Sequence, residues 1–299
     1  MGFGYFTEEQ LLPLYLSLPF IVLSVFLFHK YEKPAVGSLF LGALGLGYFM
    51  ANLDPFLILW DEQYHALVAK NMSDHPLKPM LYAEPVLPFD YRDWTANHIW
   101  LHKQPLFLWQ MALSIELFGN NELAVRLPSV IMHAIIPLFL YRIGKIALSP
   151  AAGFYGALFF ACAYFPLELI VGRYSTDHND VAFMFYFAAT FWAWFEYRHS
   201  GKKYRIVLVG ILSGMAVLVK WLLGLFIFPC WALVIFLSEK NNRFRLKTYL
   251  PAVYAFLISL LVFLPWQIFI HMNYPAEAGW ELQLNARHFH EAIEGHSQP

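Results

Sequence analysis

The sequence predicts an all-α polytopic membrane protein, and three observations support this fold class. The 299-residue chain is 59% hydrophobic and only 14% charged, whereas soluble globular chains carry about 25% charged residues. Apolar runs long enough to cross ~30 Å of hydrocarbon recur along the chain. The formal net charge is −1, which argues against nucleic acid as a partner because phosphate binding needs a basic surface.

Hydropathy indicates about eight transmembrane helices. The expected spans are residues 10–29, 36–58, 122–141, 149–171, 180–197, 205–219, 221–238 and 248–270. The apolar segment 104–118 is too short to cross comfortably, so we expect a re-entrant or interfacial helix there. We interpret residues 1–299 as a single transmembrane domain with a large first loop, 59–121, that carries interfacial helices.

The distribution of basic residues predicts the orientation. Twelve of the twenty Lys and Arg residues fall in four short segments, 30–33, 142–145, 198–205 and 240–247, which the positive-inside rule places in the cytoplasm. The loop 59–121, the turn 172–179 and the tail 271–299 then face outward. These three segments hold most of the acidic residues and histidines, so we expect a site on the extracytoplasmic face of the cell (inner) membrane.

The segment "DEQYHALVAKNM", residues 61–72, follows an apolar run that ends at Trp60. Ionisable side chains at a membrane boundary are costly to desolvate and favour a functional role. The alternative is a helix start, where acids are favoured by the helix dipole. That alternative explains one acid. It explains less well two adjacent acids, Asp61 and Glu62, with Tyr64 and His65 after them, so we favour a functional site.

The segment "NHIWLHKQPLFLWQ", residues 97–110, places Lys103 just before Pro105. Proline suits the first turn of a helix, so Lys103 is expected at a helix N-terminus, where a cation and the helix dipole together favour an anion such as phosphate. The alternative is an interfacial lysine that snorkels to the lipid headgroups. His98 and His102 are four residues apart, which places them on one face if this segment is helical.

Two further segments leave alternatives open. "GRYSTDHND", residues 172–180, gathers Arg173, Asp177 and other polar groups in one outward turn, and a capped helix start explains it equally well. Lys220 separates two apolar runs. Its ammonium group either binds a polyprenyl phosphate or extends along the membrane surface to the lipid headgroups. The tail "NARHFHEAIEGHSQP" is rich in anion-binding and metal-capable side chains, but its spacing fits no zinc motif.

Five segments in this order resemble the polyprenyl-phosphate-sugar-dependent glycosyltransferases of the GT-C fold, which include bacterial aminoarabinose transferases and dolichyl-phosphate-mannose protein mannosyltransferases. "DEQYHALVAKNM" resembles their first outward-loop motif. "HKQPLFLWQMALSIELFGNNELAVRLPSVI" resembles the segment in which an acid, Lys, Pro, Pro and Leu precede an aromatic helix. "GRYSTDHND" is similar to an Arg-Thr-Asp turn, "GMAVLVKWLLGL" to a Leu-Thr-Lys-Gly segment, and "RHFHEAIEGHSQP" to the start of a later loop. The resemblance covers roughly residues 50–299.

The resemblance implies roles for individual residues. Asp61 matches the acid central to catalysis, and Lys103 matches the lysine that contacts the lipid phosphate. Arg287 or His288 stands for a cation near that phosphate. Asp177 matches the acid of the second loop. Together with the residues singled out above, the candidate catalytic acids are Asp61, Glu62 and Asp177, and the candidate substrate- and phosphate-binding residues are Tyr64, His65, Lys103, Arg173, Lys220, Arg287 and His288.

The chain also departs from the family pattern. His102 replaces an acid that in some relatives helps to bind a metal, so a divalent ion is one expectation and its absence the other. Two spans, rather than one, precede the long loop, which would place the N-terminus outside. The family continues for several more spans, so we expect that a chain ending at Pro299 is the N-terminal part of a longer enzyme.

The predicted function is transfer of a hexosyl or pentosyl group from a polyprenyl-phosphate donor to a lipid, glycan or protein acceptor, with inversion. Asp61 would act as general base or orient an anionic acceptor, and Lys103, with Arg173 or Arg287, would stabilise the leaving phosphate. The alternatives are a transporter or flippase for a lipid-linked sugar, or an inactive membrane fragment. A transporter is disfavoured because the charges lie in loops rather than at mid-span.

Overall fold

The computed structural model describes residues 6–86, 88–93, 95–174, 177–238 and 241–287, and nearly all of its regular structure is helical. The α-helices are α1 (Glu8–Phe28), α2 (Glu32–Ala51), α3 (Asp61–Asp74), α4 (Pro105–Phe118), α5 (Glu122–Ala147), α6 (Pro150–Ala161), α7 (Tyr164–Val171), α8 (Asp177–Ser200), α9 (Tyr204–Lys220), α10 (Ile227–Ser238), α11 (Leu250–Asn273) and α12 (Pro275–Arg287). Short 3-10 helices, Trp221–Leu225 and Leu246–Tyr249, precede α10 and α11.

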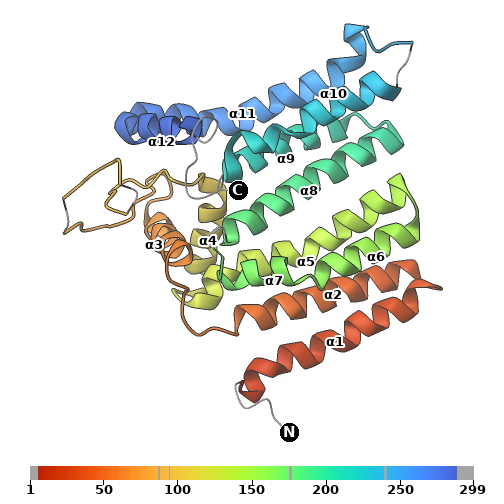
Figure 1. Ribbon diagram of the computed structural model, residues 1–299, viewed down its shortest axis with the longest axis horizontal. Helices are drawn as coiled ribbons and strands as arrows, with labels where there is room; N and C mark the ends of the chain where they lie inside the picture. The colour runs from red at the N-terminus through yellow and green to blue at the C-terminus, as the bar shows by residue number, and fades with distance from the viewer. Residues whose placement is uncertain (1–5, 87, 94, 175–176, 239–240, 288–299) are drawn as a thin grey trace, which may run out of the picture.

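The long helices lie side by side in a single row (Figure 1). Along this row α1 packs on α2, α2 on α5, α5 on α6 and α8, α8 on α9, and α9 on α11. Small residues permit the closest approach: a Cβ atom on Gly144 of α5 would lie 2.5 Å from the Cα atom of Gly153 in α6. Such contacts between small residues are how membrane helices pack without a hydrophobic driving force.

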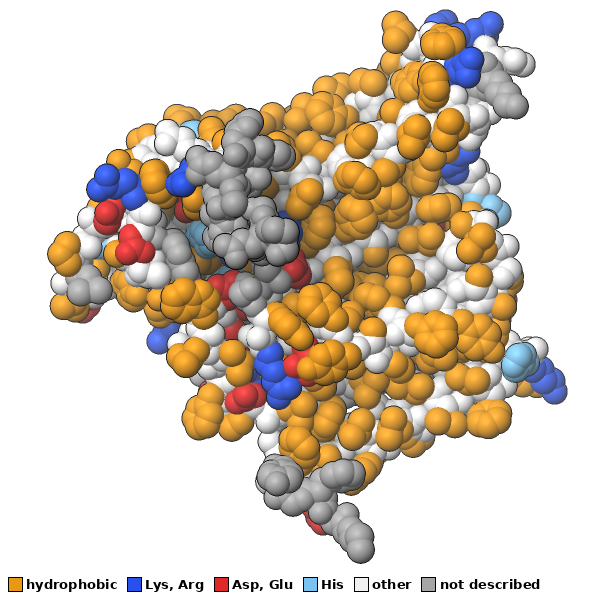
Figure 2. All heavy atoms as spheres, viewed as in Figure 1, with side chains coloured by type: hydrophobic (Ala, Val, Ile, Leu, Met, Phe, Trp, Pro, Cys, Tyr) orange, Lys and Arg blue, Asp and Glu red, His pale blue; other side chains and the backbone are white. Residues whose placement is uncertain are grey.

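The two ends of the row differ in chemistry. One end carries α3, α4, α12 and the irregular segment 75–104, and the opposite end carries the turns between α1 and α2, α5 and α6, α8 and α9, and α10 and α11. These turns are the basic segments, so the prediction that they share one end is confirmed. On the face drawn in Figure 2, hydrophobic side chains cover the long helices and charged side chains gather toward the ends.

The prediction of eight spans was too high. Among the described residues, five helices are long and apolar enough to cross a membrane: α1, α2, α5, residues Tyr204–Leu225 and residues Leu246–Asn273. A sixth span results if α6 and α7, which are bent by 41°, are counted as one. The expected span 180–197 falls within α8, whose Trp, Tyr, Thr and acidic residues make it too polar to qualify. The expected span 221–238 is shortened to the 12 residues of α10 because Trp221–Leu225 forms a separate 3-10 helix.

Other expectations hold. Two candidate spans, α1 and α2, precede the long loop. The helix expected at 104–118 is α4, which begins at Pro105 and has only 14 residues. A buried cluster that includes Trp100, Phe107, Met111, Val125 and Ile170 joins α4, α5 and α7 to the irregular segment. The candidate site residues are therefore attached to a packed core.

Candidate active site

The site begins where α3 starts. Trp60 precedes it with φ 85°, and no side chain caps the helix. Asp61 and Glu62 occupy its first turn, where the helix dipole favours acids. Consecutive residues on a helix point about 100° apart, so the two carboxylates enter different surroundings. Asp61 is partly exposed, and Glu62 is fully buried.

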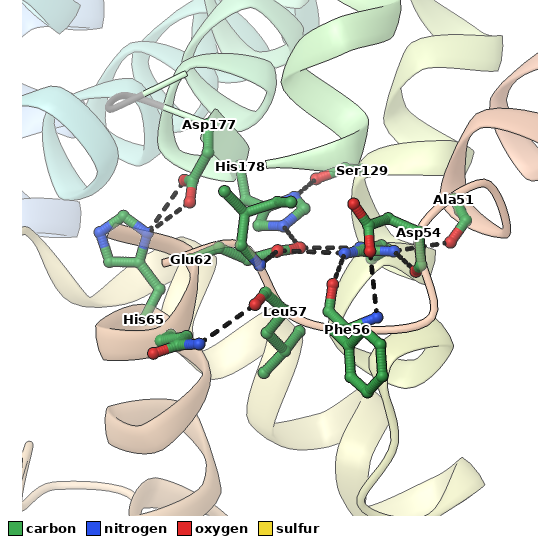
Figure 3. Close-up of polar contacts among 12 residues, drawn as sticks. Ala51, Asp54, Phe56, Leu57, Glu62, His65, Ser129, Asp177 and His178 are labelled. Atoms are coloured by element: carbon green, nitrogen blue, oxygen red, sulfur yellow. Dashed lines mark hydrogen bonds and ion pairs between the residues drawn. The ribbon is translucent and has the colours of Figure 1, made fainter. Parts of the chain in front are cut away.

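Glu62 is held by three donors (Figure 3). Arg126 of α5 donates from Nε to Oε1 (2.7 Å) and from Nη2 to Oε2 (3.1 Å), and the Ile58 amide donates to Oε2 (2.6 Å). His178 Nε2 lies 3.1 Å from Oε1. Burial opposes ionisation of Glu62, but the hydrogen bonds and charges of His178 and Arg126 more than offset it and hold the pKa of Glu62 below its ordinary value.

Arg126 uses every N–H of its guanidinium group. Besides the two bonds to Glu62, Nη1 donates to the carbonyls of Ala51 (2.9 Å) and Asp54 (2.7 Å), and Nη2 donates to the carbonyl of Phe56 (2.9 Å). A guanidinium carries five donors, and all five are satisfied. Arg126, paired with Glu62, therefore holds the segment between α2 and α3 in a fixed position.

A second histidine–carboxylate pair lies beside the first. His65 Nδ1 is 2.9 Å and 3.1 Å from the two carboxylate oxygens of Asp177, and both residues are fully buried. The Asn179 amide also donates to Asp177 (3.3 Å), so helix capping and the contact to His65 coexist. Burial would raise the pKa of Asp177, but the charges of His65 and His178 and the hydrogen bond to His65 hold it below its ordinary value.

Asp61 differs from both of these acids. Within the described part of the chain its carboxylate makes no hydrogen bond or ion pair at contact distance. Burial raises the pKa of the Asp61 carboxyl above its ordinary value and Asp177 adds to this, whereas Lys103, His65 and His102 act in the opposite direction. The structure thus brings Asp61, Lys103, His65 and Asp177 into one electrostatic neighbourhood, from three segments that are far apart in the sequence.

The backbone is strained at two positions of this neighbourhood and at one position next to Lys220. Among the described non-glycine residues, positive φ occurs at Trp60 (85°), Asp177 (25°) and Trp221 (54°). Each of these is a predicted site residue or directly adjoins one, Asp61 or Lys220. Such conformations cost on the order of 1–3 kcal/mol each and cluster at functional sites.

Other predicted residues have partners of their own. Arg173 pairs with Glu168 (3.0 Å), and Lys220 forms an ion pair with Asp180. Tyr64 is half-buried, and its ring meets that of Trp60 edge-on, with centroids 6.2 Å apart.

The last two predicted phosphate-binding residues are Arg287 and His288. Arg287 is the last residue of α12, and His288 falls outside the described residues.

Sequence reasoning missed Arg126, Ser129 and Glu281. Arg126 interrupts an apolar span, which is itself a functional signal. Ser129 lies one turn further along α5, with its Oγ 2.8 Å from His178 Nδ1. Glu281 of α12 lies 3.7 Å from His102 Nδ1, measured from Oε2.

The expectation of a divalent ion at His102 stays a prediction. Among the described residues, no group of three or more His, Cys, Asp or Glu side chains could hold a metal ion. His102 and Glu281 are a pair, whereas zinc takes three or more protein ligands in most sites and Mg²⁺ is often held by one or two carboxylates with a substrate phosphate. We therefore derive no step through a metal.

An apolar cavity of about 1080 Å³ lies next to Lys220. It is bounded by the 3-10 helix Trp221–Leu225 and the start of α10 on one side, and by Leu282, Asn285 and Ala286 of α12 on the other. Lys220 and Asn285 are the polar residues in its lining.

Comparison with known proteins gives a consistent result. The profile of the dolichyl-phosphate-mannose-protein mannosyltransferase family matches residues 102–269. An uncharacterised protein of Aquifex aeolicus is 26% identical over 240 residues, 75% of this chain and 44% of that protein. An undecaprenyl phosphate-alpha-4-amino-4-deoxy-L-arabinose arabinosyl transferase of Pseudomonas savastanoi pv. phaseolicola is 29% identical over 194 residues, 61% of this chain and 34% of that protein.

Two solved structures share the fold. The apo crystal structure of ArnT from Cupriavidus metallidurans superposes with a TM-score of 0.61 at 18% identity, covering 82% of this chain and 43% of that one. The second structure is AglB, the oligosaccharyltransferase of Archaeoglobus fulgidus, in complex with an inhibitory peptide and a dolichol-phosphate. It superposes with a TM-score of 0.57 at 15% identity, covering 89% of this chain and 35% of that one. The chain thus spans 34–44% of the length of these two sequence relatives.

Proposed function

This chain belongs to the dolichyl-phosphate-mannose-protein mannosyltransferase family of membrane glycosyltransferases, which have the GT-C fold, and we propose that it moves a sugar from a polyprenyl-phosphate donor to an extracytoplasmic acceptor. One observation carries this proposal: Asp61, a carboxylate with a raised pKa and no contact partner among the described residues, lies in the electrostatic neighbourhood of Lys103. A base and a phosphate-binding cation at one site are what this transfer requires.

The position of Lys103 supports its role. It stands two residues before Pro105, the first residue of α4, so it lies close to backbone N–H groups that are free to bind an anion. The lipid phosphate would bind there. The apolar cavity beside Lys220 has the chemistry to take part of an isoprenoid chain, because apolar lining favours removal of such a chain from water.

The reaction is a single displacement. A hydroxyl oxygen of the acceptor attacks the anomeric carbon, the bond from that carbon to the phosphate oxygen breaks, and its electron pair leaves on the lipid phosphate. The hydroxyl proton goes to Asp61, and the anomeric centre is inverted. Lys103 stabilises the charge that accumulates on the leaving phosphate. We assign Glu62 to holding α3 in place, since its carboxylate is buried and fully occupied.

The experiment uses the complete protein in lipid nanodiscs with radiolabelled undecaprenyl-phosphate aminoarabinose and dolichyl-phosphate mannose as donor probes. We expect the label to leave one of these lipids and appear on an acceptor in a membrane extract. Asp61→Asn should lower the rate by a factor on the order of 10² or more. In sealed vesicles that contain the protein, translocation of an intact donor across the bilayer would instead indicate a flippase.

The asparagine variant has a built-in check on folding. Asparagine keeps the shape of Asp61, and an acid in the first turn contributes about 0.3–1 kcal/mol through the helix dipole. Because burial disfavours the ionised form of Asp61, removal of its negative charge should leave the unfolding midpoint nearly unchanged. A folded Asp61→Asn enzyme that transfers sugar at the wild-type rate would refute the assignment.

The outward location of the site has a separate test. A reporter enzyme that is active only outside the cytoplasm should give signal when fused after residue 85, in the segment beside α3. The same fusion after Lys202, in the basic turn between α8 and α9, should give none. The reverse pattern would place the site in the cytoplasm and contradict this part of the proposal.

A further inference from the structure

A cluster of cations without acidic partners lies at the end of the row opposite the candidate active site. The described acids of the basic segments are Glu32 and Glu196. Glu32 pairs with Lys145, and Glu196 pairs with both Arg142 and Arg205. Six further cations of these segments make no ion pair within the described part of the chain. They are Arg198, Lys202 and Lys203 beside the turn between α8 and α9, and Arg243, Arg245 and Lys247 between α10 and α11.

A pocket of about 250 Å³ lies where the ends of α8, α10 and α11 meet. Arg198 and Gly201 bound it at the end of α8, Trp231 and Ile235 of α10 give it an apolar wall, and Thr248 bounds it from the 3-10 helix before α11. Pockets that enclose a drug-sized ligand measure about 300–1,000 Å³. This one is smaller, so it suits a head group rather than a whole lipid.

Two hydrogen-bond donors in the pocket lining are unused. Arg198 lies over the ring of Trp194, with its guanidinium carbon 5.5 Å from the ring centroid, but it makes no hydrogen bond within the described residues. The ring of Tyr197 contacts that of Trp231, with centroids 5.5 Å apart, and the Tyr197 hydroxyl group likewise bonds to none of the described residues. A guanidinium and a hydroxyl group are both suitable donors to phosphate oxygens.

The segment between α10 and α11 holds a further cation in place next to this pocket. Arg243 lies between two rings, with its guanidinium carbon 5.2 Å from the ring centroid of Phe236 and 5.1 Å from that of Phe244. The Tyr249 hydroxyl group donates to the carbonyl of Arg243 (2.8 Å). Within the described part of the chain, Arg243 Nε is buried without a hydrogen-bond partner. The pocket is therefore bordered by a fixed positive charge as well as lined by one.

We propose that this pocket binds the phosphate head group of an anionic phospholipid. Clusters of about four to eight Lys and Arg residues at the ends of membrane helices attract anionic lipids, and the six cations form such a cluster. Because the pocket lies at the opposite end of the row from Asp61 (Figure 1), the inference does not depend on the proposed sugar transfer.

The surroundings favour a lipid over a free phosphate ion. A free ion would use the cations but would leave the apolar wall of the pocket without a partner. The helices α10 and α11 also carry exposed apolar side chains, along which acyl chains would lie. In Figure 2, Lys and Arg side chains gather where Figure 1 places the turn between these helices, and hydrophobic side chains follow next to them. The exposed apolar residues include Leu233, Leu237, Val253 and Leu257.

The experiment measures lipid binding to the complete protein in detergent by native mass spectrometry, with dioleoyl phosphatidylglycerol as the probe. We expect saturable binding of this lipid and weaker binding of dioleoyl phosphatidylcholine, whose head group has no net charge. Arg198→Gln should weaken phosphatidylglycerol binding about 10-fold or more, because it removes a hydrogen bond between charged groups. Tyr197→Phe, which removes only a neutral donor, should weaken binding a few-fold.

Lys203→Gln is the matched control. It removes the same charge from an exposed cation at the start of α9 that does not line the pocket, so it should change the affinity little. Arg198→Lys keeps the charge and should retain part of the affinity. Because Arg198 and Lys203 are both exposed, the unfolding midpoints of these variants without added lipid should match that of the wild type.

Three outcomes would contradict the inference. Equal losses of affinity in Arg198→Gln and Lys203→Gln would show a diffuse attraction between the basic end and anionic lipids, without a specific pocket. Equal affinities for phosphatidylglycerol and phosphatidylcholine would show that the cations do not select the ligand. Displacement of the bound phosphatidylglycerol by millimolar inorganic phosphate would show that the pocket takes the anion alone.

Discussion

Glu62 and Arg126 form a two-point ion pair in which both side chains are 0% exposed, with Nε to Oε1 at 2.7 Å and Nη2 to Oε2 at 3.1 Å. Arg126 also binds three carbonyls of the segment that precedes α3. The pair therefore fixes where α3 begins, and with it the position of Asp61. The two adjacent acids thus differ in their surroundings: Glu62 is held by Arg126, whereas Asp61 is the proposed base.

Arg126→Leu should destabilise the protein strongly. Removing one partner of a buried ion pair leaves an uncompensated charge, at a cost of about 3–5 kcal/mol. We expect a clear fall in the unfolding midpoint, measured by a thiol-reactive dye or by circular dichroism in detergent.

Arg92→Leu is the matched control. Arg92 pairs with Asp90 on the surface, where the two side chains are 60% and 42% exposed. Exposed pairs contribute little to stability, so this variant should unfold with the wild type. An Arg126→Leu protein as stable as Arg92→Leu would show that the buried pair does not anchor α3.

The contacts of Glu62 with His178 and Arg126 predict a dependence of stability on pH. The pKa of Glu62 is lowered from its ordinary value of 4.5, so the folded protein binds this proton less readily than the unfolded chain does. The stabilisation is present above pH 4.5 and is lost as pH falls through the lower pKa of the folded state. Glu62→Gln should be less stable than the wild type at neutral pH, and the difference between the two should shrink as the pH is lowered. A constant difference would contradict this assignment.

Gly172 should tolerate no side chain. Its φ is +78°, and a Cβ atom there would lie 2.8 Å from both carboxylate oxygens of Glu62. The left-handed backbone alone costs an L-residue about 1–2 kcal/mol, and the contact adds about 1–3 kcal/mol of overpacking.

Gly201→Ala isolates the backbone cost. Gly201 has φ +68°, and a Cβ atom there would meet nothing within 4 Å. Gly172→Ala should therefore lower the unfolding midpoint further than Gly201→Ala does. If the two substitutions had equal effects, Glu62 would have to move aside without cost. That result would contradict the inference that Arg126, whose five N–H groups are all bonded, holds Glu62 in place.

Local patterns predicted much of this molecule. Some signals can be read from neighbouring residues alone. Apolar runs and the basic residues of the turns predicted the membrane class and the α1–α2 hairpin, and Pro105 predicted the start of α4. The number of spans was wrong for a related reason. Hydropathy averages over a window, and it does not register the break between α6 and α7 or the 3-10 segment Trp221–Leu225.

Partners that are distant in sequence could not be predicted. Arg126 is 64 residues from Glu62, and Asp177 is 112 residues from His65. The sequence marked each of these side chains as polar in an unusual place, but it did not indicate which would meet. Pairing decides whether an acid is held in place or left without a contact partner, so the difference between Glu62 and Asp61 could not be predicted without the fold.

The two lysines predicted to bind phosphate should differ in their effect on donor binding. Lys103 makes no ion pair at contact distance within the described residues, whereas Lys220 is already paired with Asp180. A hydrogen bond to a charged group contributes about 1.5–3 kcal/mol, so Lys103→Met should weaken binding of tritiated undecaprenyl phosphate on the order of 10- to 100-fold. Lys220→Met should weaken it only a few-fold, because the charge of Lys220 is already largely offset by that of Asp180.

Asp180→Asn completes the comparison between the lysines. This substitution releases Lys220 while keeping the size of the side chain at position 180, so a lipid phosphate within reach of Lys220 should bind more tightly. Unchanged affinity in Asp180→Asn, together with a large loss in Lys103→Met, would confine the phosphate to the N-terminus of α4. A loss in Lys220→Met as large as that in Lys103→Met would instead place it beside the apolar cavity, and Asp61 would then need a different partner for the leaving group.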